Sequence, residues 1–144
     1  MTRSTLYTLL TILFFTQCSL TTEPIQYGID SCHFCRMTIV DQQHASQIVT
    51  KKGRNYKYDA IECMVQSLPD WQSNEINTYL ISDYNSPGKM INALEAKYLI
   101  SESIPSPMGA FLSGFDTESQ RDTFVKLETD RRLSWTEMKV DIQK

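Results

Sequence analysis

A strand–hairpin–helix–strand pattern occurs twice along this chain, and this repetition limits the possible folds more than any other feature. The first unit falls within residues 30–86 and the second within residues 87–144. Neither unit alone is long enough to enclose a sizeable hydrophobic core. We therefore predict an α+β fold in which two related ββαβ-type halves pack together or share a sheet.

The first half is predicted from period-two alternation, a turn signal and one helical repeat. Asp59 can cap the helix, because its carboxylate can accept hydrogen bonds from the free amides of the first turn. Pro69 then ends the helix. The predicted elements are strands at residues 37–41, 45–50, 55–58 and 77–83, a hairpin tip at 51–54 and a helix between Asp59 and Pro69.

The second half repeats this pattern after a turn at residues 85–88. Asp116 is predicted to cap its helix, which continues to Leu127 with Phe124 and Leu127 facing inward. The segment that follows, residues 132–138, is predicted to be the closing strand. The remaining predicted elements are extended segments at residues 90–93, 96–101 and 109–115.

The N-terminus has the composition of a bacterial export signal. Arg3 precedes the apolar run Leu6–Phe15, which is too short to span a bilayer. The run ends just before Cys18, and cleavage ahead of a cysteine that then carries acyl chains is the lipoprotein pattern. We predict a signal peptide over residues 1–17, lipidation of Cys18 at a membrane facing the periplasm, and a tether over residues 18–29. Ordinary secretion without lipid is the alternative.

Composition narrows the possible functions of the mature chain. Removal of 17 of the 144 residues leaves 127, enough for one compact domain or two very small ones. Only Arg3 is lost among the charged residues, so 13 basic side chains face 17 acidic ones. This mild acidity argues against a nucleic-acid partner, which would require a basic face. With Cys18 lipidated, Cys32, Cys35 and Cys63 remain, and an odd, small number of cysteines is not a disulfide framework.

Residues 32–37 (CHFCRM) concentrate the chemistry, and three interpretations of the two thiols compete. A redox Cys-x-x-Cys normally follows a buried strand and opens a helix, whereas this one follows a tether and precedes a β-rich stretch. A structural zinc site would need two more ligands in addition to Cys32 and Cys35. Cys63 could supply one, but His44 has no second ligand near it in the sequence with which to complete the site. A plain disulfide between Cys32 and Cys35 is favoured by an oxidising compartment.

The fourth interpretation is a Cu(I) site, because thiolate and thioether sulfur are soft donors that select Cu(I) over hard cations. Met37 lies two residues beyond Cys35. Met108 lies in the segment Ser106-Pro107-Met108-Gly109, where proline stiffens the approach and glycine permits a tight backbone. A methionine in a rigid loop suits presentation to a ligand better than core packing.

Several separated motifs in the same order resemble the nitrous-oxide-reductase accessory lipoproteins of the NosL family. The resemblance covers roughly residues 33–135, and the motifs that carry it are Cys32-x-x-Cys35-x-Met37-x-Ile39, Ala45-Ser46-Gln47-Ile48, Tyr58-Asp59 with Cys63-Met64, and Pro107-Met108-Gly109 with Phe115. It implies two ββαβ-type halves and a periplasmic, lipid-anchored copper chaperone without catalytic activity. The implied partners are the membrane transporter complex for copper-site assembly and nitrous-oxide reductase, or a related copper enzyme.

The resemblance also implies the ligands of the Cu(I) site. Carried onto this sequence, they are Cys35, Met37 and Met108, together with Cys32. Two further residues are weaker candidates, namely Cys63, which falls on the predicted helix among packing residues, and His33. His44 is predicted to lie on the surface rather than to bind metal.

One departure from the family pattern is Arg36, which follows the second cysteine where the family commonly has glycine. A bulky cation at this position could repel Cu(I) slightly or mark a docking surface. The other functional classes left open by the sequence are a tethered thiol–disulfide oxidoreductase and a purely structural lipoprotein with a disulfide staple.

Overall fold

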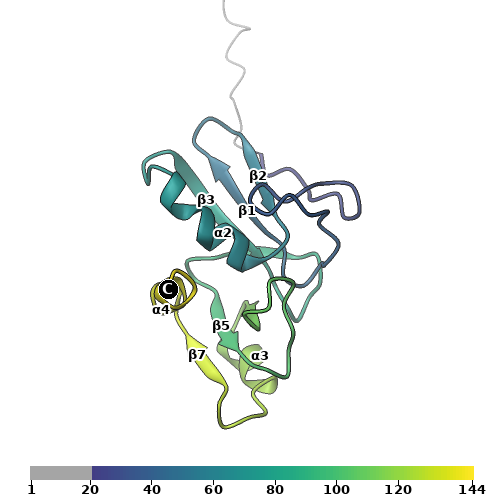
Figure 1. Ribbon diagram of the computed structural model, residues 1–144, viewed down its shortest axis with the longest axis vertical. Helices are drawn as coiled ribbons and strands as arrows, with labels where there is room; N and C mark the ends of the chain where they lie inside the picture. The colour runs from purple at the N-terminus through teal and green to yellow at the C-terminus, as the bar shows by residue number, and fades with distance from the viewer. Residues whose placement is uncertain (1–20) are drawn as a thin grey trace, which may run out of the picture.

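The structure is a computed structural model that describes residues 21–144, so the predictions for the signal peptide and for Cys18 lie outside the described residues. Within this part of the chain, no helix is both long enough and apolar enough to cross a bilayer. Figure 1 shows two small sheets, one above the other, with short helices beside them. In order, the elements are β1 (Ser46–Thr50), β2 (Asn55–Tyr58), α2 (Ile61–Ser67), a 3-10 turn (Leu68–Asp70), β3 (Ile76–Ser82), β4 (Met90–Asn92), β5 (Lys97–Ile100), β6 (Leu112–Phe115), α3 (Glu118–Thr123), β7 (Arg131–Leu133) and α4 (Trp135–Ile142).

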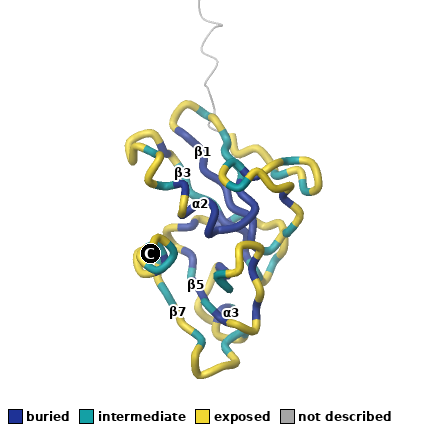
Figure 2. The backbone as a smooth tube through the Cα atoms, viewed as in Figure 1, coloured by how far each residue is buried: buried dark blue, intermediate teal, exposed yellow. Residues whose placement is uncertain are grey.

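The first sheet has the strand order β2-β1-β3-β4, and all its neighbours are antiparallel. Strand β1 lies inside the sheet, where Ser46 pairs with Tyr58 on one side and with Ile81 on the other. Every residue of β1 is buried, because β2 and β3 flank it and α2 packs against it. In Figure 2, β1 and α2 accordingly form the buried centre of this half.

The second sheet repeats the arrangement of the first with the order β6-β5-β7, again antiparallel. Its first strand in sequence, β5, is also central, with its hairpin partner β6 on one side and the strand after the helix on the other. The order β5-β6-α3-β7 thus matches β1-β2-α2-β3. The predicted α+β fold with two related ββαβ-type halves is confirmed at the level of topology.

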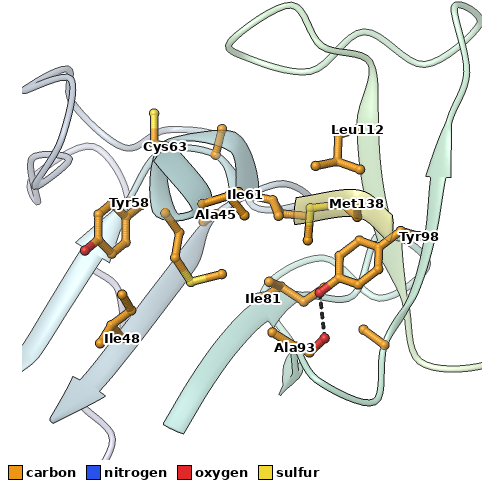
Figure 3. Close-up of a cluster of buried hydrophobic side chains, with 14 of the residues drawn as sticks. Ala45, Ile48, Tyr58, Ile61, Cys63, Ile81, Ala93, Tyr98, Leu112 and Met138 are labelled. Atoms are coloured by element: carbon orange, nitrogen blue, oxygen red, sulfur yellow. Dashed lines mark hydrogen bonds between the residues drawn. The ribbon is translucent and has the colours of Figure 1, made fainter. Parts of the chain in front are cut away.

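Strand β4 joins the two halves in an unexpected way. It lies beyond residue 87, where the sequence placed the second half, but it pairs with β3 of the first sheet, Ile91 opposite Ile81. Tyr98 on β5 donates a hydrogen bond of 2.7 Å to the carbonyl of Ala93, just after β4. The connection between the sheets is therefore tied down inside the core rather than left as a free linker (Figure 3).

A shared hydrophobic core holds the two halves together. Ile61 of α2, Ile81 of β3 and Met138 of α4 are fully buried in one cluster that also contains residues of the second sheet (Figure 3). Gly114 of β6 lies so close to Ile81 that a β-carbon at this position would overlap the end of the Ile81 side chain. Glycine is thus what allows β6 to approach β3.

A buried polar contact also connects the halves, and it corrects the prediction for His44. Instead of lying on the surface, the His44 side chain is buried against β6. Its Nδ1 lies 2.8 Å from the Asp41 carboxylate and its Nε2 lies 3.2 Å from the Ser113 hydroxyl. A buried imidazole requires partners for both nitrogens, and these two residues supply them.

Four predicted elements differ from the structure. Residues 37–41 form no strand, because the one β-contact there is an isolated bridge between Ser31 and Thr38. Residues 132–138 were predicted as a strand but lie mostly in α4, which Ser134 and Glu137 begin with a reciprocal capping box. Asp59 and Asp116 are not the N-caps of their helices, because Ala60 precedes α2 and Thr117 precedes α3. Helix α3 also ends at Thr123 rather than at Leu127.

Candidate metal centre

The Cys32–Met37 segment folds into a tight loop that brings its two thiols together. The backbone amide of Cys32 donates to the carbonyl of Met37 at 2.8 Å, and the amide of Arg36 donates to the carbonyl of Cys32 at 3.1 Å. Arg36 has a φ of 67°, in the left-handed region that favours glycine. This loop geometry gives a physical reason for glycine at this position in the family pattern.

A third thiol reaches the loop from α2. The Sγ atoms of Cys32, Cys35 and Cys63 all lie within 4.8 Å of one another, in the one metal-competent group of this kind found among residues 21–144. Three thiolates that share one ion at metal–sulfur distances of about 2.3 Å would lie about 3.8–4.0 Å apart. Small side-chain shifts would therefore bring all three onto one ion.

The cluster is closed on one side and open on the other. Cys32 and Cys63 are fully buried, whereas Cys35 is partly exposed. The segment continues to Met37, whose side chain is 56% exposed. Donor groups thus run from solvent into the protein, which is the arrangement that stepwise ligand exchange requires.

The environment of the thiols favours one preformed thiolate. A hydrogen bond from the Cys63 thiol, with further donation from the backbone amides of Asp59 and Cys35, lowers the pKa of Cys32 to about 4. The amide of Cys35 lies 3.4 Å from the Cys32 sulfur. The same contact with Cys32 raises the pKa of Cys63, and burial together with Cys32 raises the pKa of Cys35. These opposite pKa shifts favour the thiolate at Cys32 and the protonated thiol at Cys35 and Cys63.

Met108 is presented by a loop that is fastened to α2. The side chain of Met108 is 38% exposed, so this methionine is not a core residue. Ser106 donates a short hydrogen bond to Glu62, the residue before Cys63. The backbone amide of Ala110 also acts on the Glu62 carboxyl. Two anchors that flank Met108 therefore connect its loop to the helix that carries Cys63.

His33 lies among aromatic rings rather than in the sulfur cluster. Its ring packs against Tyr56 at 4.8 Å and against Tyr58 at 6.0 Å between centroids. Its backbone amide donates to the carbonyl of Lys57 at 2.8 Å, which fixes the cysteine loop to β2. In this arrangement His33 positions the loop through its backbone and packs through its ring.

The arrangement disfavours two other chemistries. No helix begins at Cys32, so the Cys-x-x-Cys lies in a turn rather than at the helix N-terminus of a thioredoxin-type site. The contacts of Asp41, His44 and Ser113 have the composition of a hydrolase triad, but Ser113 is fully buried and its hydroxyl cannot meet a substrate.

Comparisons with known proteins identify the family and the fold of the chain. The family model described as NosL matches residues 27–142. The fold is similar to a crystal structure described as the copper chaperone NosL from Shewanella denitrificans, with a TM-score of 0.69 at 16% sequence identity, over 81% of this chain and 94% of that one. No curated protein sequence matches the chain.

Proposed function

The chain belongs to the NosL family, and on that premise we propose that it is a copper chaperone that binds Cu(I) and passes it on without catalysing a reaction. The observation that carries the proposal is the group formed by Cys32, Cys35 and Cys63, which opens toward solvent at Cys35. Thiolates are soft donors, and they prefer Cu(I) to hard cations. The similar protein from Shewanella denitrificans is itself described as a copper chaperone.

We assign the ion to Cys35, Met37 and Met108, with Cys32 as the next ligand and Cys63 within reach. The exposed thioethers of Met37 and Met108 are weaker donors than thiolates, so a partner thiolate can displace them first. The buried pair Cys32 and Cys63 would then hold the ion until the partner has engaged it. Two or three sulfur ligands at a partly open site permit such exchange, whereas a closed tetrahedral cage would not.

The proposed site lies where the two halves meet. Cys35 and Met37 belong to the first half and Met108 to the second. The contact of Ser106 with Glu62 supports this placement, because it holds the Met108 loop against α2 one residue away from Cys63. Binding of one ion by ligands from both halves would also stabilise their packing.

We further propose that the protein acts at the cell envelope, facing the periplasm, with a lipid on Cys18. The sequence before residue 21 supports this through its export signal and the cysteine that follows it. The partners that fit are a membrane transporter complex for copper-site assembly and, through it, nitrous-oxide reductase or a related copper enzyme.

Anaerobic competition for Cu(I) against a chromogenic chelator tests the copper proposal. Every described element lies after residue 21, so a mature chain that begins at Cys18, with Cys18→Ser, retains the whole fold. Cys35→Ser and Met108→Ala probe the two halves of the site. Met90→Ala is the matched control, because Met90 is a partly buried methionine on β4 whose sulfur accepts a hydrogen bond from Ser82.

We expect binding of one Cu(I) per chain, weakened by Cys35→Ser and Met108→Ala and unchanged by Met90→Ala. Unchanged affinity in Met108→Ala would remove Met108 from the site. A chain that never competes with the chelator would refute the copper proposal as a whole.

The second candidate is a thiol–disulfide oxidoreductase, which the low pKa of Cys32 favours. Full burial of Cys32 opposes it, because a nucleophilic thiolate must reach the disulfide of its substrate. Insulin reduction that depends on Cys32 and Cys35 would support this candidate, and its absence in a copper-binding protein would exclude it.

A further inference from the structure

The first described residues are fastened to one end of β2. The amide of Glu23 donates to the Asn55 side chain at 3.1 Å, and that side chain donates to the carbonyl of Thr21 at 3.3 Å. Gln47 on β1 donates to the carbonyl of Glu23 at 3.0 Å. The first described residues therefore lie beside the β1–β2 hairpin (Figure 1).

This attachment limits how far the hairpin can lie from a lipid on Cys18. Thr21 is three residues from Cys18, and three extended residues span at most about 11 Å. Asn55, which contacts Thr21, directly follows the turn of the hairpin. The inference below rests on the proposed lipidation of Cys18, which would bring this turn close to the bilayer surface.

The turn itself is basic and unpaired. Lys51, Lys52 and Arg54 are exposed, and none of them has a carboxylate within 4.0 Å among the described residues. They line an open pocket of about 490 Å³ together with Tyr56, Trp71 and one acidic residue, Glu75. Figure 2 shows the exposed turn at the end of the hairpin.

The charge of the turn contrasts with that of the whole molecule. The mature chain has 13 basic and 17 acidic side chains, so an anionic membrane would repel it on average. A local basic turn at the point nearest the bilayer changes that interaction, because headgroup attraction acts within about a Debye length. Aromatic rings beside basic side chains are typical of membrane interfaces.

We propose that the β1–β2 hairpin tip, Lys51 to Arg54, is a contact surface for anionic phospholipid headgroups that orients the protein on its membrane. The cysteine loop is tied to the other end of β2, through His33 and Lys57. Lys57 is two residues beyond Asn55, about 7 Å farther along the strand. A contact made by the four residues of the tip does not itself include the cysteine loop.

Vesicle sedimentation tests the surface without lipidation or copper. The mature chain with Cys18→Ser is mixed with vesicles of phosphatidylcholine alone or of equal parts phosphatidylglycerol and phosphatidylcholine. One variant combines Lys51→Gln, Lys52→Gln and Arg54→Gln. Its matched control removes three positive charges from the second half through Lys126→Gln, Lys139→Gln and Lys144→Gln.

We expect the chain to bind only the vesicles that contain phosphatidylglycerol, and we expect salt to weaken this binding. The hairpin variant should have an affinity about 100-fold lower, which corresponds to about fivefold for each charge removed. The control variant should lose much less. Equal binding by the hairpin variant, or equal binding to both vesicles, would overturn the proposal. So would displacement by inorganic phosphate at constant ionic strength, since the turn would then be a site for free anions.

The failure of this proposal can be told apart from the failure of the copper proposal. The hairpin variant keeps every sulfur ligand, so its Cu(I) affinity should equal that of the unchanged chain. Lipidation is measured separately, as the mass of the N-terminal peptide after expression of the full chain in a bacterial host. Vesicle binding that fails in a lipidated, copper-binding protein would overturn the membrane surface alone.

Discussion

Replacement of Cys63 by alanine should change the ionisation of a different residue, Cys32. The Cys63 thiol is the main cause of the low pKa of Cys32, which is about 4. At pH 7, well above that value, Cys32 should be mainly thiolate, whereas a thiol with an ordinary pKa near 8.5 is about 3% ionised. Removal of the donor leaves two backbone amides and the Cys35 thiol to oppose the effect of burial, so the pKa should rise toward the ordinary value.

Ultraviolet absorbance of the thiolate measures this change in the reduced, metal-free chain with Cys18→Ser. The pKa values of Cys35 and Cys63 are raised, so the unchanged chain should carry close to one thiolate at pH 7. Cys63→Ala should lose most of it. Cys63→Ser is the matched control, since its hydroxyl can still donate to the Cys32 sulfur and should preserve part of the shift.

Two results would refute this reasoning. The first is an unchanged chain whose absorbance shows no ionisation below pH 6, since Cys32 would then have an ordinary pKa. The second is an equal titration midpoint in Cys63→Ala, which would mean that the backbone amides and the Cys35 thiol stabilise the thiolate without Cys63. Alkylation is a poor substitute for absorbance, because Cys32 is fully buried.

Three further substitutions test the structure in urea unfolding experiments. Arg36→Gly should raise the unfolding free energy by up to about 1 kcal/mol, because it relieves a φ of 67°, while Arg36→Ala keeps the strain and should not. Gly114→Ala should cost about 1–3 kcal/mol through overlap with buried Ile81, and an unchanged midpoint would show that β6 can move away. Burial raises the pKa of Glu62, so its contribution to stability is greatest below the unfolded value near 4.3 and is lost as the pH rises through the folded value. Glu62→Gln should therefore be more stable than the unchanged chain at pH 8 but not at pH 4, and parallel pH profiles would contradict this.

The sequence predicted most of the strands because alternation and turn residues are local signals. The β1–β2 hairpin, β3, β5 and β6 lie where alternation placed them. The closing segment was misread because its apolar residues suggested a strand, although Ser134 and Glu137 are spaced as a capping box and α4 follows. The segment at residues 37–41 alternates as well, but it has one bridge partner and no sheet neighbour. Whether an alternating segment pairs with a neighbouring strand depends on the rest of the fold, and alternation alone does not predict it.

Part of the candidate site was predictable because several of its residues are close together in the sequence. Cys32, Cys35 and Met37 are neighbours in sequence, and a short loop must keep them close. Cys63 was treated chiefly as a packing residue, since its helix reads as amphipathic, whereas six of the seven residues of α2 are buried. When nearly every residue of a helix is buried, the sequence pattern does not show which side of the helix faces a metal site and which side faces the core. The signal that could have identified Cys63 is the odd number of cysteines, since a third soft donor without a disulfide partner needs another role.

The burial of the sulfur cluster also bears on how an ion would enter and leave the proposed copper site. A partner approaching from solvent meets the exposed thioether of Met37 and the partly exposed Cys35 before the buried Cys32 and Cys63. Because Cys32 is already ionised, an ion that moves inward would meet a thiolate without first displacing a proton from that sulfur. An ion that moves outward leaves behind a thiolate that the Cys63 thiol, the Cys35 thiol and two amides continue to stabilise. The same hydrogen bonds that prepare Cys32 for binding therefore weaken its hold on the ion, since they compete with the metal for the charge of the sulfur. This balance suits the proposed release of copper, and it would give the buried third cysteine a function even where it does not touch the metal.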